Sequence, residues 1–175
     1  MRLLKTLVGI FSLITFFSLP TAYAQIKVGE KAPGFITSTL DGKRMTLKDY
    51  WEMKGNKALV LSFFATWCQP CKEDLKYLQG VQDQRGSLPG LQVLCILTQD
   101  TSKPDAVKDF MDKLGVSLPV FTDEYGIIGK RYAVTGLPAN FVIDHEGILR
   151  ARYLGYSEAV KRDFEGKLKG LLAAP

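Results

Sequence analysis

Two long runs of almost exclusively apolar residues lie in the middle of the chain. They are residues 58–64, Ala-Leu-Val-Leu-Ser-Phe-Phe, and residues 91–97, Leu-Gln-Val-Leu-Cys-Ile-Leu. Strands that are covered on both faces have this continuous apolar pattern, whereas half-exposed strands alternate between apolar and polar residues. We therefore expect two central parallel strands in a sheet with helices on its faces.

Two further segments have the pattern of β-hairpins. The first, residues 35–47, has Asp41-Gly42 at its centre, a dipeptide that favours a two-residue hairpin loop. The second, residues 140–153, turns at residues 145–147, where His145 is expected to face solvent. This second hairpin would close the sheet with antiparallel strands.

Helical spacing of apolar residues predicts helices between and after these segments. From Ser102 to Gly115 apolar residues recur at intervals of three and four, with Ser102 as the expected capping residue and Gly115 as the stop. Residues 160–171 carry a similar stripe and predict a C-terminal helix. In chain order the elements are hairpin, strand, helix, strand, helix, hairpin and helix, which indicates an α/β fold with a mixed sheet.

The first 24 residues have the pattern of an export signal. Two basic residues and an apolar run of 13 residues precede Pro20 and the small-x-small motif Ala22-Tyr23-Ala24. We expect residues 1–24 to be a signal peptide that is cleaved after Ala24. An uncleaved membrane anchor is the alternative, because the uncharged stretch just reaches the length of a membrane span. Either way, residues 25–175 form one exported domain, in the periplasm or at the outer face of the cytoplasmic membrane.

Composition narrows the possible functions of that domain. Without the leader the chain has 151 residues and its formal charge falls from +5 to +3, so we expect one domain and no nucleic-acid partner. Three cysteines and one histidine are too few for a disulfide-stapled scaffold or a histidine-rich metal site. We therefore expect no metal.

Two of the cysteines, Cys68 and Cys71, lie where the first apolar strand leads into a helix. Cysteines at this spacing can close a small disulfide ring, and free N–H groups at the start of a helix stabilise a thiolate on the first of them. Pro70 suits the first helical turn because it lacks an N–H group. Trp67 would shield the sulfurs from water on one side. The arrangement favours redox chemistry.

A purely structural or metal-binding role suits the cysteine pair less well. A structural disulfide across two residues would remove little entropy from the unfolded chain. A zinc site would need a second pair of ligands, and Cys95 and His145 do not have ligand spacing. Cys95 lies in an apolar run and is expected to be a core thiol.

The motif and its surroundings resemble the thioredoxin superfamily. Trp67-Cys-Gln-Pro-Cys71 looks like its active-site motif. Residues 28–35, Asp41-Gly42 and residues 132–144 are similar to the exported TlpA/ResA/DsbE-like branch, also labelled redoxin or AhpC-TSA-like. The resemblance implies a thioredoxin-like α/β fold, with a central mixed β-sheet flanked by helices and an extra N-terminal β-hairpin.

The resemblance also implies roles for the cysteines. Cys68 would be the nucleophile, Cys71 the resolving thiol, and the Cys68–Cys71 disulfide the redox group, with no other cofactor. Asp74 matches an acidic residue of the family and is a candidate proton shuttle to Cys71. Because helix starts favour acids, Asp74 could equally be an ordinary residue of the first turns. Thioredoxins proper bury an aspartate where this chain has Ser62.

A substrate groove is implied by the same resemblance. Pro138 matches the family's cis-proline, and Leu137 before it would pair with an extended substrate segment. Trp67 and Pro70 would complete the groove. An ordinary trans-proline is the alternative for Pro138. The branch often has threonine after its cis-proline, where this chain has Ala139. The sequence therefore does not show which partner is recognised.

These features indicate a thiol-disulfide oxidoreductase of the cell envelope. The resemblance implies a monomeric reductant of protein disulfides, for example that of apocytochrome c in cytochrome c maturation, supplied by a membrane thiol donor of the DsbD/CcdA type. The residues themselves do not give the direction of electron flow.

Two other functions remain as alternatives. A peroxiredoxin-like thiol peroxidase would have proline and a hydroxyl residue where this chain has Leu61 and Ala65. A non-catalytic thioredoxin-fold binding module would use the groove beside Pro138 and would not need Cys68.

Overall fold

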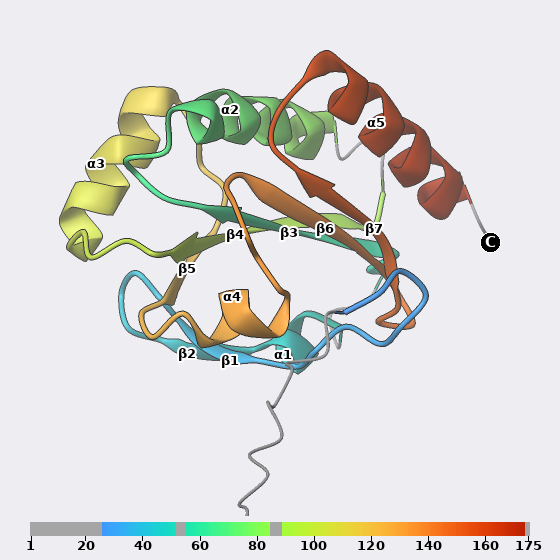
Figure 1. Ribbon diagram of the computed structural model, residues 1–175, viewed down its shortest axis with the longest axis horizontal. Helices are drawn as coiled ribbons and strands as arrows, with labels where there is room; N and C mark the ends of the chain where they lie inside the picture. Colours follow the sequence, from blue (N-terminus) through green and yellow to red (C-terminus); the bar gives the residue numbers. More distant parts are fainter. Residues whose placement is uncertain (1–25, 52–54, 85–88, 174–175) are drawn as a thin grey trace, which may run out of the picture.

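The structure is built on one mixed β-sheet with helices on both of its faces (Figure 1). The computed structural model describes residues 26–51, 55–84 and 89–173; the predicted leader, residues 1–24, lies outside them. The strands are β1 (Ile36–Thr39), β2 (Arg44–Thr46), β3 (Ala58–Phe64), β4 (Leu91–Thr98), β5 (Val120–Asp123), β6 (Ala139–Asp144) and β7 (Leu149–Leu154). The helices are α1 (Leu47–Trp51), α2 (Gln69–Asp83), α3 (Pro104–Leu114), α4 (Ile127–Arg131) and α5 (Glu158–Ala173). None of the helices in these described ranges is long and apolar enough to cross a membrane.

The two apolar runs form the centre of the sheet, as predicted. The strand order is β2-β1-β5-β4-β3-β6-β7, and β3 pairs in parallel with β4. On its other side β3 pairs antiparallel with β6, the first strand of the predicted closing hairpin. Every residue of β3 is buried. The expected α/β fold with a central mixed sheet is therefore confirmed.

The N-terminal hairpin extends the sheet through a strand that the sequence pattern does not reveal. Strand β1 pairs with β2 as expected and also pairs antiparallel with β5. The predicted order of elements omits β5 and the five-residue helices α1 and α4, so that part of the prediction is wrong. Elements of four or five residues are too short to show a period of their own.

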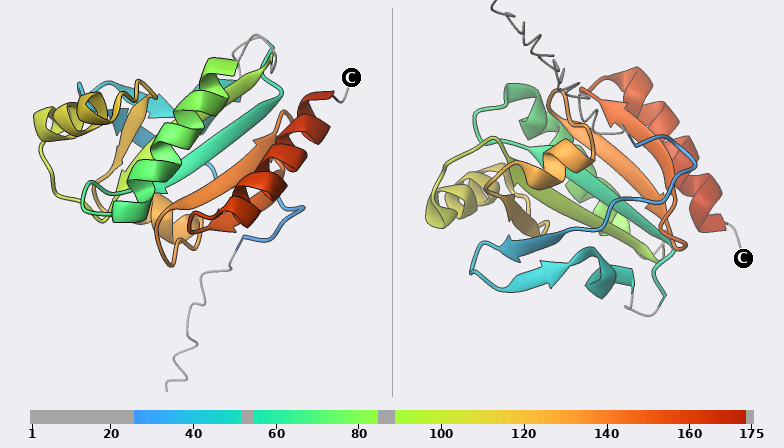
Figure 2. Two further views of the ribbon diagram at one scale, coloured as in Figure 1. Left: turned by 90° about the horizontal axis from the view of Figure 1, so that it is seen from above. Right: turned by 60° about the horizontal axis from the view of Figure 1, so that its bottom comes forward.

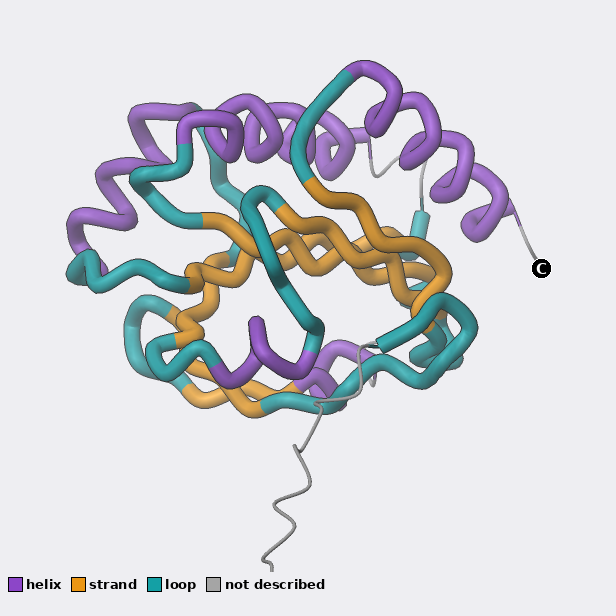
Figure 3. The backbone as a smooth tube through the Cα atoms, viewed as in Figure 1, coloured by secondary structure: helices purple, strands orange, loops and turns teal. Residues whose placement is uncertain are grey.

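The side chains of β3 alternate between two cores, one on each face of the sheet. Val60 and Phe64 belong to the core beneath α2, α3 and α5, whereas Leu61 and Phe63 belong to the core beside α4. Figure 1 and Figure 3 show α2 and α5 on one face and α4 on the other, and Figure 2 shows the hairpin on the α4 side. By this alternation Ser62 faces α2, the helix that follows β3.

The start of α3 differs from the prediction. The helix begins at Pro104, and Lys103 precedes it without a side-chain capping bond. Ser102 is not the cap, because its N–H donates to Asp100 and its hydroxyl lies 3.2 Å from that of Thr66. The predicted stop is present: Gly115 has φ 68°, a conformation that glycine adopts without strain.

Candidate active site

The disulfide between Cys68 and Cys71 lies at the junction of β3 and α2. Cys68 is the last residue before the helix and has an extended backbone, with φ −79° and ψ 105°. Cys71 lies in the first turn, and the two Cα atoms are 5.3 Å apart. Cys68 is 4% exposed and Cys71 is fully buried, so Cys68 is the more accessible residue of the pair. Pro70 is in the first turn, as predicted.

The sheet brings Pro138 to the same end as this disulfide. The Leu137–Pro138 peptide bond is cis. Pro138 immediately precedes β6, and Ala139 pairs with Phe63 near the end of β3 that leads to Cys68. Pro138 is buried, and its carbonyl oxygen accepts a hydrogen bond of 2.8 Å from the N–H of Gly155. The structure thus places the predicted groove residue beside the loop that carries the cysteines.

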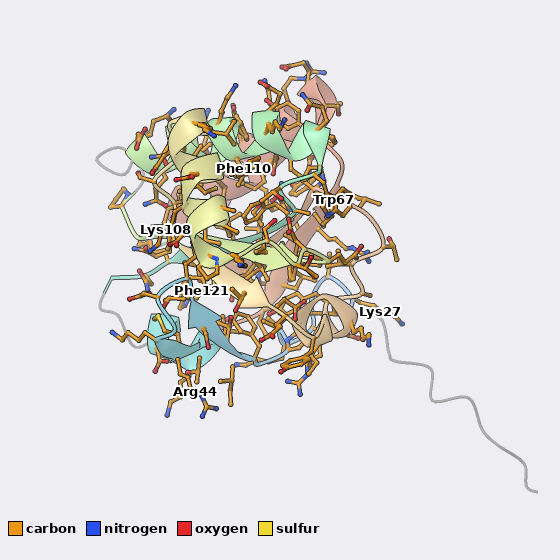
Figure 4. The ribbon with its side chains drawn as sticks, turned by 90° about the vertical axis from the view of Figure 1, so that its left-hand side faces the viewer. Lys27, Arg44, Trp67, Lys108, Phe110 and Phe121 are labelled. Carbon is orange, nitrogen blue, oxygen red and sulfur yellow. A yellow bond between two sulfur atoms is a disulfide. The ribbon has the colours of Figure 1, made fainter. Side chains whose placement is uncertain are left out.

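Trp67 lies at the protein surface, far from the hairpin that carries Arg44 (Figure 4). The side chain is 64% exposed, and the shielding of the sulfurs by its ring stays a prediction. Its Nε1–H donates a 3.1 Å hydrogen bond to the carbonyl oxygen of Gln99. The indole is therefore held in place at one edge and leaves most of its apolar surface available to a partner.

Asp74 lies on the buried side of α2. It is one helical turn after Cys71, is 2% exposed, and does not belong to the first turn of α2. Ser62 Oγ donates a hydrogen bond of 3.4 Å to Oδ2, and Asn140 Nδ2 lies 3.0 and 3.1 Å from Oδ1 and Oδ2. The interpretation of Asp74 as an ordinary acid at a helix start is therefore wrong.

Burial decides the protonation behaviour of Asp74. Loss of water around the carboxylate raises its pKa from 3.8 to about 6, although the hydrogen bonds from Asn140 and Ser62 oppose this change. At pH 7 the group is largely ionised, and it is a stronger base than an exposed carboxylate. The site thus has a buried sulfur and, one helical turn later, a buried carboxylate.

Cys95 is a core thiol, as predicted. It is free and fully buried on β4, where it pairs with Ser62 of β3. Burial, and secondly the charge of Asp74, raise the pKa of this thiol far above its usual range. A protonated, enclosed thiol does not react by disulfide exchange.

A second acid, Asp100, was not predicted from the sequence; it holds the loop that carries the cysteines. The backbone N–H and the hydroxyl of Thr66 donate to Asp100 Oδ2 at 2.6 and 2.7 Å. Burial opposes the charge of Asp100, but the hydrogen bonds from Ser102 and Thr66 outweigh it and lower its pKa. The parallel pairing of β3 and β4 would have suggested this contact, because Thr66 and Asp100 follow the two strands at the same edge of the sheet.

Comparison with known proteins agrees with this geometry. The model of the AhpC/TSA family matches residues 28–152. The chain belongs to the AhpC/TSA family. This family member is 32% identical over 145 residues to the thiol-disulfide oxidoreductase ResA of Bacillus thuringiensis (strain Al Hakam), covering 83% of the chain and 79% of that relative. It is 29% identical over 143 residues to the thioredoxin-like protein YneN of Bacillus subtilis (strain 168), covering 82% and 79%.

A solved structure extends the agreement to the fold. The crystal structure of a candidate thiol:disulfide interchange protein DsbE from Chlorobium tepidum has a TM-score of 0.74 and 27% identity, covering 85% of this chain and all of that one. The family member therefore lies in the TlpA/ResA/DsbE-like branch of the thioredoxin superfamily. Together with the Cys68–Cys71 disulfide, these relatives identify it as a thiol-disulfide oxidoreductase.

Proposed function

We propose that the protein works in the cell envelope as a reductant of protein disulfides, with Cys68 as the nucleophile. The observation that supports Cys68 as the nucleophile most strongly is the asymmetry of the disulfide. Cys68 ends the loop before α2 and is slightly exposed, whereas Cys71 is fully buried above Asp74. Such a pair exposes one sulfur to a partner and keeps the other for the second step.

The reaction takes place in two exchanges. The Cys68 thiolate attacks one sulfur of the partner's disulfide, and the other partner sulfur leaves with the electron pair of the broken bond and takes up a proton. Cys71 then attacks the Cys68 sulfur while its thiol proton passes to Asp74. The partner's second sulfur leaves as a thiolate, so the partner gains two electrons and the Cys68–Cys71 disulfide forms.

The groove for the partner consists of Trp67, Pro70, Leu137 and Pro138. The exposed indole of Trp67 and the half-buried side chain of Leu137 offer apolar contacts to a peptide. An extended segment on either side of the partner's cysteine would lie along the backbone that precedes β6.

The partners and the location follow from the resemblance to exported relatives and from the pattern of residues 1–24. We propose that a membrane thiol donor of the DsbD/CcdA type reduces the protein. Apocytochrome c is the proposed target, the periplasm or the outer face of the cytoplasmic membrane is the proposed location, and the protein would act as a monomer without a further cofactor.

The redox potential, measured by equilibration with glutathione, tests the direction of electron flow. A reductant should have a potential near that of thioredoxin, about −270 mV, and a value near about −120 mV would identify an oxidase instead. Peroxide consumption by the reduced protein that is lost in Cys68→Ser would favour the peroxidase alternative.

The partner can be trapped with Cys71→Ser, which stops the reaction at the mixed disulfide. The matched control is the double variant Cys68→Ser/Cys71→Ser, which lacks the nucleophile. Covalent partners found only with the single variant would support the proposal. A Cys68→Ser protein that keeps its full function in cells would contradict it and favour a non-catalytic binding module.

A further inference from the structure

Three elements of the fold meet at the carboxylate of Asp74. Helix α2 carries the acid, β3 supplies Ser62, and β6 supplies Asn140 only two residues after cis-Pro138. The strand register makes this meeting necessary, because Ser62 pairs with Asn140 and both side chains then lie on the α2 side of the sheet. Asn140 is 3% exposed, so its amide faces the acid without competition from bulk water.

The amide of Asn140 is only half satisfied. Its Nδ2 lies within hydrogen-bond distance of both Asp74 oxygens, at 3.0 and 3.1 Å. Its Oδ1 is the one side-chain oxygen or nitrogen that is buried without a hydrogen-bond partner in the described part of the chain. An unpaired buried acceptor is unfavourable and rare in folded proteins.

The unpaired oxygen of the Asn140 amide can act as an acceptor for the protonated acid. An amide carries a donor and an acceptor at nearly equivalent positions, and a half-turn about its last bond exchanges them. While Asp74 is ionised, the NH₂ group is the matching partner. Once Asp74 has taken up a proton, its O–H needs an acceptor, which the Oδ1 of the rotated amide supplies.

We propose that Asn140 is a positioning residue that serves Asp74 in both protonation states, donating to the carboxylate and, after a half-turn of its amide, accepting from the carboxyl proton. The inference rests on the proposed role of Asp74 as the proton acceptor of Cys71. When the Cys71–Cys68 bond forms and the Cys68–partner bond breaks, the electron pair leaves with the partner's sulfur. The Cys71 proton moves to Asp74, and the amide of Asn140 turns to hold it.

Neighbouring residues control the protonation of Asp74 by hydrogen bonds rather than by their charge. Tyr77 on α2 and Cys95 on β4 interact with Asp74 electrostatically, and burial raises the pKa of each, so both are neutral near pH 7. Glu165 of α5 accepts a hydrogen bond from the Tyr77 hydroxyl and so faces that ring. Cys71 itself carries no charge while it is bound to Cys68.

Titration of the Asp74 side-chain carboxyl by carbon NMR tests the inference without any substrate. In Asn140→Leu, which replaces the amide by an apolar side chain of similar size, hydrogen bonds to both protonation states of Asp74 are lost. The charge-assisted bond to the carboxylate is the stronger of the two, so the midpoint should still move upwards, by up to about one pH unit. Ser62→Ala is the matched control and should move it less, since its hydrogen bond is the longer one at 3.4 Å. Asn140→Ala, checked for folding by circular dichroism, replaces the leucine variant if that variant does not fold.

The half-turn has its own signal. In the wild-type protein the side-chain NH₂ resonances of Asn140 should titrate with the same midpoint as the Asp74 carboxyl, because the group changes its partner when the proton arrives. An Asp74 midpoint that stays unchanged in a folded Asn140 variant overturns the inference. NH₂ resonances that do not move through the Asp74 titration overturn the half-turn.

The carboxyl titration and the rate of the resolving step together distinguish the role of Asn140 from the proton role of Asp74 on which it rests. If the midpoint moves as expected while Asp74→Asn resolves mixed disulfides at the wild-type rate and with the wild-type pH profile, control by Asn140 is supported and the proton role of Asp74 fails. If Asp74→Asn slows the resolving step and Asn140→Leu shifts its pH profile upwards with the carboxyl midpoint, both are supported.

Discussion

The stability of the protein should depend on pH through Asp74 in the direction opposite to that of most acids. The pKa of this carboxyl is about 6 in the folded protein and 3.8 in its ordinary environment, because burial disfavours the charge. The folded state therefore binds the proton more tightly than the unfolded chain. Stability contributed by the protonated carboxyl is present below about pH 4 and is lost as the pH rises to about 6.

Asp74→Asn removes this dependence while keeping the size of the side chain. The difference between the two pKa values corresponds to about 3 kcal/mol of unfavourable free energy for the ionised group, an upper value for an acid that is 2% exposed. The variant should thus be more stable than the wild type by up to ~3 kcal/mol at pH 7.5. The altered hydrogen bonds to Ser62 and Asn140 reduce this gain. Its advantage should disappear near pH 4.

Urea unfolding of both oxidised proteins between pH 4 and pH 8 measures this difference, because contributions from all other groups cancel. Glu73→Gln, a neutralised exposed acid at the preceding position of α2, is the control and should change stability by no more than about 0.5 kcal/mol at any pH. The cost of the altered hydrogen bonds does not depend on pH in this range, so the reasoning is refuted if the stability of Asp74→Asn relative to the wild type does not rise between pH 4 and pH 7.5.

Three further predictions concern the loop and the core thiol. Asp100→Ala should lower the free energy of unfolding by about 1–3 kcal/mol, because the N–H of Thr66 loses its partner, and it should also slow disulfide exchange. Urea unfolding and insulin reduction measure these two effects, and Asp109→Ala, which removes an exposed acid, should change neither. Trp67→Ala should change stability by less than about 1 kcal/mol but should raise the KM for a disulfide peptide about tenfold, because the exposed indole serves the partner rather than the core; an unaltered KM would exclude it from the groove. Cys95 should react with a thiol reagent only after unfolding, because it is enclosed and protonated, and labelling of the native protein would contradict its burial.

The sequence contains most of the information about the central sheet. The runs that became β3 and β4 are almost entirely apolar because both faces of those strands are covered, and this pattern can be recognised without the structure. The turns of both hairpins are also marked, by Asp41-Gly42 and by Gly147. Strand β5 leaves no such mark, because it is four residues long and has its register set by its neighbours β4 and β1.

Only those parts of the candidate site that lie within a single segment of the sequence could be predicted. The Cys68–Cys71 spacing and the position of Pro138 within a family-like segment lead to the disulfide and to the cis peptide bond. Strand pairing brings Asn140 and Asp100 to the site, and the register of that pairing cannot be predicted from any one segment. For the same reason Ser102, which has the spacing of a helix cap, instead binds the loop of the other strand.

The most direct test of the central claim follows disulfide transfer by mass spectrometry. The reduced protein is mixed with one equivalent of an oxidised peptide that contains a C-x-x-C-H disulfide. Each protein molecule should lose two hydrogens as one peptide gains them, and Cys71→Ser should stop at a covalent protein–peptide complex through Cys68. Transfer that persists in Cys68→Ser, or a reduced wild-type protein that leaves the peptide oxidised, would contradict the account.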